Sequence, residues 1–195
     1  MRIFAIAVAA LALAAVCPSR ADAKTTHHAK TSARPAKSAV NSPISSDQAK
    51  AVAELAKTGL SIQADLNDAI ASVSEDQLSR RTAAGNGVVV SIECFQVLEG
   101  AAVELTGNLK ELLVAAATAS LAKDQSDLAT SLSFTRLALA DVGDSVALVQ
   151  KVTSERPSPA CRSSLLYRDQ ISKLQTFAHD VTGVTDDLQV AVGPQ

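Results

Sequence analysis

The chain contains no proline between Pro43 and Pro157, a stretch long enough for several helices. Proline removes a backbone donor and clashes with the preceding turn, so its absence leaves helices free to continue for many turns. Within this stretch, apolar or small residues recur alternately three and four positions apart, the spacing of one helix face packed against neighbours. The first such series comprises Val52, Leu55, Gly59, Ile62, Leu66, Ala69 and Val73.

Local signals divide the pattern into separate helices. Ser45 and Gln48 form a capping-box pattern at the start of the first helix, and Gly85-Asn86-Gly87 marks the turn that ends it. A second series of apolar positions runs from Val88 and continues in helical period. The polar residues 123–126, which include possible N-caps, are expected to separate the second helix from the third.

The fourth predicted helix begins where Ser158 and Pro159 offer a favoured N-cap and first-turn pair. Gly193 and Pro194 end it. Four helices with short links are typical of an up-down-up-down bundle. We therefore predict an all-α fold, with this four-helix bundle over residues 45–195 and a disordered N-terminal extension.

The N-terminus has the three-part pattern of a secretory signal peptide over residues 1–23. A short positive start precedes an apolar run from Ile3 to Val16, and Ala21-Asp22-Ala23 fits a cleavage site. An uncleaved anchor and a lipid on Cys17 are alternatives, although the run is short for a membrane span. The pattern predicts a periplasmic or secreted protein whose mature chain begins at Lys24 and has no transmembrane segment.

Residues 24–44 form a basic linker with four cations and no acidic residue. They contain too few large apolar side chains to fold, so we expect disorder. Residues 45–195 carry 12 bases and 19 acids, a net charge of −7. The linker is thus either a solvated spacer or an electrostatic arm for an anionic envelope component. The formal charge of the whole chain, −2, argues against a nucleic-acid partner.

Two cysteines, Cys94 and Cys161, remain after removal of the signal peptide. An even number in an oxidising compartment indicates a disulfide. In the predicted topology the second and fourth helices begin at the same end of the bundle, so the two residues can meet. No C-x-x-C motif supports a redox role.

Recognisable catalytic and cofactor chemistry is missing from the sequence. It has no H-E-x-x-H, Walker or G-x-S-x-G motif, and Thr176 occupies the place where a Glu-x-x-His pair with His179 would need glutamate. His27-His28 would make a weak metal site. The carboxylates Glu104 and Asp141 fall outside the series of apolar positions that we call the helix seams. We predict no enzyme activity, no catalytic residues, no cofactor and no metal.

The remaining hypothesis is an exported, non-enzymatic helical bundle that acts through protein or cell-envelope contacts. The alternative is a module that binds a small apolar ligand in the bundle core, although small seam residues leave little room there. Self-association is expected if apolar residues outside the seams form a second face, and the alternative is that some of them simply widen the core stripe. The candidates for such a face are Leu78, Val97, Leu113, Leu137, Leu148 and Leu166.

Overall fold

A computed structural model describes residues 43–83 and 92–193, all within one unit of the chain, Ala39–Gln195. This part contains five helices and no strand, which confirms the all-α prediction. The helices are α1 (Ser46–Ala83), α2 (Ile92–Ser120), α3 (Gln125–Ser154), α4 (Pro159–Ser163) and α5 (Leu165–Val192). The predicted signal peptide, nearly all of the linker, the turn at 85–87, Val88 and Pro194 lie outside the described residues.

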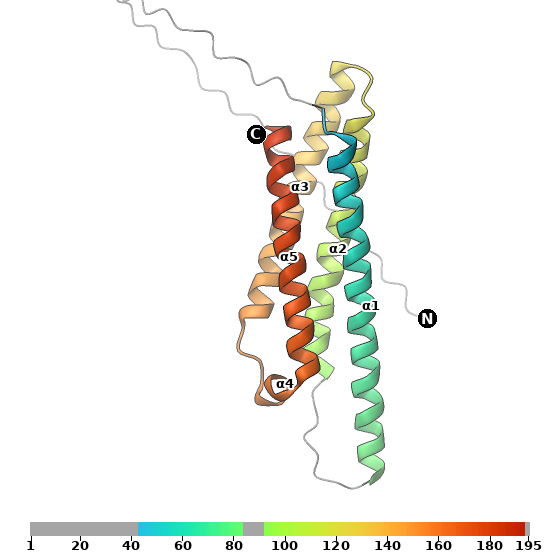
Figure 1. The fold of residues 1–195 in the computed structure, drawn as a ribbon, viewed down its shortest axis with the longest axis vertical. Helices are drawn as coiled ribbons and strands as arrows, with labels where there is room; N and C mark the ends of the chain where they lie inside the picture. The colour runs from blue at the N-terminus through green and yellow to red at the C-terminus, as the bar shows by residue number, and fades with distance from the viewer. Residues whose placement is uncertain (1–42, 84–91, 194–195) are drawn as a thin grey trace, which may run out of the picture. The chain divides into compact units, whose positions relative to one another are not determined.

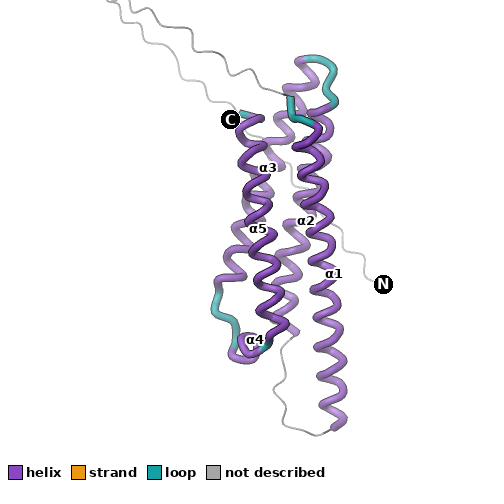
Figure 2. Tube along the Cα trace, in the orientation of Figure 1, coloured by secondary structure: helices purple, strands orange, loops and turns teal. Residues whose placement is uncertain are grey.

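The four long helices lie side by side, and each runs in the opposite direction to the one before it (Figure 1). Helix α2 packs against α1 and α3, while α5 packs against α3 and α1. The short helix α4 lies in the connection between α3 and α5, at the end of the bundle where α2 begins (Figure 2).

Two helix starts are built from the local signals in the sequence. The Ser45 amide donates to Gln48 Oε1 at 2.9 Å, and the Gln48 amide donates to Ser45 Oγ at 3.1 Å. This reciprocal pair is the predicted capping box and satisfies two orphan donors. At the start of α3, Asp124 Oδ1 accepts from the amides of Ser126 and Asp127. An N-cap therefore separates α2 from α3 without any proline or glycine.

The prediction of a single helix after Pro159 is wrong. The N-cap at Ser158 is confirmed, but the helix stops after five residues and a second helix starts at Leu165. Ser164 has extended backbone angles, and its hydroxyl accepts from the Tyr167 amide at 3.2 Å. This hydroxyl caps α5, and the break allows α4 to turn away from the axis of α5.

The seams predicted from the sequence form the core. Every seam position that the structure describes is buried or partly buried. The largest fully buried side chains include Phe95, Phe177, Leu66 and Leu105. Packing begins one residue before the predicted boundary of the bundle, because Ile44 is also buried against the core. A continuous apolar interior therefore joins all four long helices.

Gly59 marks a place where α1 comes close to α2 and α5. A Cβ atom at this position would collide with Thr106 Oγ1 and would lie 2.9 Å from Phe177 Cζ. Thr106 is fully buried, and its hydroxyl donates to the Ala102 carbonyl at 2.7 Å. The hydroxyl cannot move away without losing this bond, so only glycine allows this approach of the three helices.

We expect Gly59→Ala to lower the free energy of unfolding by about 1–3 kcal/mol, the usual cost of overpacking. Gly100 and Gly143 are exposed, and a Cβ atom there would meet no atom within 4 Å. The same substitution at these two positions should therefore raise stability by about 0.5–1 kcal/mol, because alanine favours the helix. Urea unfolding of the three variants checks the opposite signs, and a stabilised Gly59→Ala would contradict the close packing.

Candidate interaction surface

Apolar side chains are exposed together on the side of the bundle formed by α2 and α3. Their exposed fractions are 77% for Leu121, 67% for Val114, 61% for Phe134 and 58% for Leu137. We call these four residues the α2–α3 face. Val114 lies two positions after the buried Leu112, and Phe134 lies one position before the buried Thr135. Successive helix residues point about 100° apart, so the seams that fill the core leave these side chains outside.

Two adjoining hollows lie on this face. The first has a volume of about 530 Å³ and includes Leu137, and the second has about 720 Å³ and includes Leu121. Val114, Thr118, Ser131 and Phe134 line both hollows. Small buried residues, Ser131 and Ala138, contribute to the lining of the first hollow. The projecting Phe134 therefore stands beside depressions that smaller side chains leave.

Charged residues of both signs surround the apolar area. Lys110, Glu111 and Asp141 line the first hollow. Lys123 and Asp127 line the second. Among the residues that the structure describes, none of these five forms an ion pair. Their charges are therefore available to groups that approach the face from outside.

The lysines of α1 and α5 are arranged differently. Lys50 pairs with Asp47, and Lys57 pairs with Glu54. Lys173 pairs with Asp169 and with Asp65 of α1, and its hydrogen bonds to these carboxylates raise its pKa. Exposed pairs like these contribute little stability. They do show that the lysines on the α1–α5 side form ion pairs within the chain.

The residues predicted for a second apolar face do not lie together. Leu113 and Leu148 are partly buried and widen the core, whereas Leu137 belongs to the α2–α3 face. Leu78, Val97 and Leu166 are exposed, but line neither of the two hollows. Phe134, Val114 and Leu121 were not predicted. Their signal was the separation of Val114 and Leu121 by seven residues and of Phe134 and Leu137 by three, which places each pair on one helix side.

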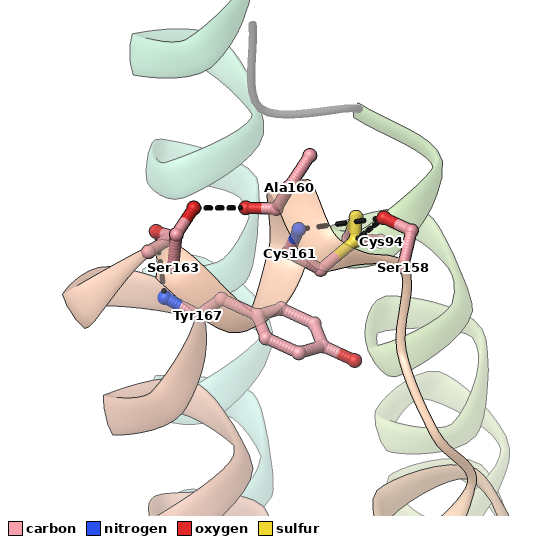
Figure 3. The surroundings of a disulfide bond; sticks show 7 residues. Cys94, Ser158, Ala160, Cys161, Ser163 and Tyr167 are labelled. Carbon is pink, nitrogen blue, oxygen red and sulfur yellow. Dashed lines mark hydrogen bonds between the residues drawn. A yellow bond between two sulfur atoms is a disulfide. The ribbon is translucent and has the colours of Figure 1, made fainter. Parts of the chain in front are cut away.

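Cys94 of α2 and Cys161 of α4 lie at disulfide distance, with Cα atoms 6.2 Å apart (Figure 3). Both are buried, and Ser158 Oγ lies 3.0 Å from Cys161 Sγ. Near this pair, the rings of Phe95 and Tyr167 meet edge to face, with centroids 5.7 Å apart. The pair ties the start of α2 to the α3–α5 connection, at the end of the bundle predicted from the topology.

Tyr167 offers a direct probe of this end of the bundle, because the chain has one tyrosine and no tryptophan. Burial raises the pKa of Tyr167 above its ordinary value of 10.0. Tyr167 should therefore lose its proton at a lower pH in the unfolded chain than in the folded protein. The contribution of neutral Tyr167 to folding stability is complete below about pH 10 and is lost as the pH rises through the pKa of the folded state. We expect tyrosinate absorbance to rise at higher pH in folded than in urea-unfolded protein. Superimposable curves would contradict the burial.

The other sequence candidates remain apart from one another. His179 is exposed and lines a hollow between α1 and α5 with Glu54 and Asp180. Glu104 and Asp141 are exposed, as expected for positions off the seams. Within 43–83 and 92–193, no three histidine, cysteine or acidic side chains gather in a way that could hold a metal ion. His27 and His28 lie outside those ranges.

No helix in the described part of the chain is long and apolar enough to cross a membrane. The chain matches no family model, no curated protein and no solved structure. Its class is therefore defined by its own fold and surface. It is an all-α helical bundle with a buried cysteine pair at disulfide distance and an exposed apolar area between two helices.

Proposed function

We propose that this chain is an exported, non-enzymatic helical-bundle protein that acts by binding another protein through the α2–α3 face. The observation that supports this function most is the exposure of Val114, Leu121, Phe134 and Leu137 side by side on two neighbouring helices. Contiguous exposed apolar surface on a water-soluble fold marks an interaction site, and aromatic residues are favoured at its centre.

The architecture that we infer is an up-down-up-down four-helix bundle formed by α1, α2, α3 and α5, with α4 as an addition to the last connection. A signal peptide over 1–23 and a disordered linker over 24–44 precede it. The alternating directions of the long helices support the topology. Rigid packed helices suit a binding role, because they present the α2–α3 face without a cost of ordering it.

Two observations favour export. The pattern of residues 1–23 is that of a signal peptide, and Cys94 and Cys161 lie at disulfide distance in the folded bundle. Disulfides persist in oxidising compartments such as the periplasm or the extracellular space. The intact mass of protein exported by its own signal should correspond to a chain that starts at Lys24 and lacks two thiol hydrogens. A mass that retains residues 1–23 would contradict the proposal.

A small apolar ligand is the second candidate, and the first hollow favours it. Its volume of about 530 Å³ is in the range of ligand sites, which run from about 300 to 1,000 Å³. This hollow lies at the surface, whereas the sequence suggested a site in the core. A ligand carrier should retain an adduct in native mass spectrometry, and this adduct should disappear from a Leu137→Asp variant.

Site-specific photocrosslinking tests the protein-binding function. A photoreactive phenylalanine analogue replaces Phe134 in the full chain, which is then exported and irradiated in its own host. The matched control places the analogue at Leu60, an exposed apolar position on α1. We expect a crosslinked protein product from position 134 and not from position 60. No product from position 134, or equal products from both, would contradict a role for the α2–α3 face.

A further inference from the structure

We propose that the partner of the α2–α3 face is a second copy of this chain, related to the first by a two-fold axis. This inference rests on the proposed function, because it uses the same face and names its occupant. In such a pair, α2 and α3 of one copy lie against α2 and α3 of the other. The same residues then contribute from both sides, as in any isologous interface.

The size of the face meets the needs of a dimer. From their exposed fractions, the four apolar side chains present on the order of 500 Å² of surface, near the upper end for a single patch on a monomer. Two copies would therefore bury about 1,000 Å² before any rim residue is counted, which is the lower limit for a biological interface. The aliphatic part of Lys110 and the side chain of Thr118 enlarge this area.

The α2–α3 face has both projecting side chains and hollows, so the projections of one copy can enter the hollows of another. Phe134 and Val114 line both hollows, so exposed side chains stand between two depressions. A two-fold rotation about an axis beside Phe134 places each Phe134 ring in a hollow of the opposite copy. Both rings are then removed from water, and one hollow of each copy is filled, by a single docking geometry.

The charges also suit a second copy. The first hollow carries Lys110 together with Glu111 and Asp141, and the second carries Lys123 together with Asp127. A rim with both signs can pair with its own rotated image, so that a lysine of one copy meets a carboxylate of the other. These lysines form no ion pair within the described residues, in contrast to those of α1 and α5. A rim of a single sign would instead have indicated an oppositely charged partner.

The first test measures the molar mass of the purified mature chain by sedimentation equilibrium over a range of concentrations. We expect a reversible monomer–dimer equilibrium in which the dimer fraction rises with protein concentration. Phe134→Asp should weaken the dimer at least about tenfold, since it places a charge in an apolar contact. The matched control is Val190→Asp, at an exposed valine on α5, which should leave the dissociation constant unchanged.

The second test locates the contact by cysteine crosslinking. Thr118 and Thr58 are both exposed, and each donates its hydroxyl to the carbonyl four residues earlier. Thr118 lines both hollows of the α2–α3 face, whereas Thr58 lies on α1. With the native cysteines closed, a short bismaleimide should convert Thr118→Cys to a covalent dimer and leave Thr58→Cys monomeric. Equal dimer yields would contradict the assigned interface.

The outcomes separate this inference from the proposed function. A wild-type chain that stays monomeric at every concentration overturns the second copy as partner. If position 134 nevertheless crosslinks to a different protein in the host, the protein-binding function stands. A dimer that Phe134→Asp leaves intact also overturns the inference, because another surface then forms it. Circular dichroism and thermal unfolding of each variant exclude misfolding as the cause of a lost dimer.

Discussion

Replacement of Phe177 by alanine is expected to lower the free energy of unfolding by about 3–5 kcal/mol. The ring is 1% exposed, and its tip packs beside Gly59 of α1. Removal of the ring leaves a cavity that the rigid helices around it cannot close. The loss of stability therefore includes both the transfer free energy of the ring and the cost of the cavity. Urea denaturation with circular dichroism as the signal measures the effect.

Three further variants separate the cavity from other effects of the substitution. Phe177→Leu keeps most of the volume and should lose much less stability than Phe177→Ala. Leu165→Ala, at an exposed position on the same helix, should change stability by no more than about 0.5 kcal/mol. Gly59→Ala should be less harmful in the Phe177→Ala background, because the contact with Phe177 is then gone, but it should remain destabilising because the collision with Thr106 persists. A small loss from Phe177→Ala, near that of Leu165→Ala, would contradict the packing of α5 against α1.

Loss of the disulfide between Cys94 and Cys161 should lower the free energy of unfolding by an amount similar to that expected for Phe177→Ala. The two residues are 67 positions apart, and closing a loop of this length stabilises a folded chain by about 4 kcal/mol in the chain-entropy model. We expect the double variant Cys94→Ala/Cys161→Ala to unfold at a much lower urea concentration than the oxidised wild type. In a chain that starts at Lys24 the double substitution leaves no free thiol, so mispaired products do not affect the comparison.

Thiol reactivity gives the control for this prediction. Both cysteines are buried, so a maleimide should modify neither in the oxidised native protein and both after reduction in urea. Reduced wild-type protein should match the double variant in its urea midpoint. Modification of the native protein without reductant, or a midpoint that is the same in oxidised and reduced protein, would show that the disulfide does not form.

Most of the framework could be predicted from residues close together in the sequence. The start of α1 depends on Ser45 and Gln48, and the start of α3 depends on Asp124 and the two amides that it caps. The seams depend on a repeat that one helix carries by itself. Even the meeting of Cys94 and Cys161 followed from the order of the helices, because antiparallel neighbours bring alternate starts to one end.

The candidate surface could be predicted only in part. Leu137 was among the residues expected on a second face, but it stood there beside Leu113 and Leu148, which the fold partly buries. Phe134 stands beside the buried Thr135, and its sequence neighbours do not distinguish a wide core from an exposed face. Exposure at such a position depends on how far away the next helix lies.

The sequence by itself determined the helical class, the capped starts of α1, α3 and α4, and the seam positions that make up much of the core. These features depend on periodicity and on hydrogen bonds that span three or four residues. Only the tertiary structure decided that α4 breaks from α5 at Ser164, that Gly59 must make room for Thr106 and Phe177, and that Phe134 faces water. The last two depend on the distance between helices far apart in the chain, and that distance follows from packing the whole bundle.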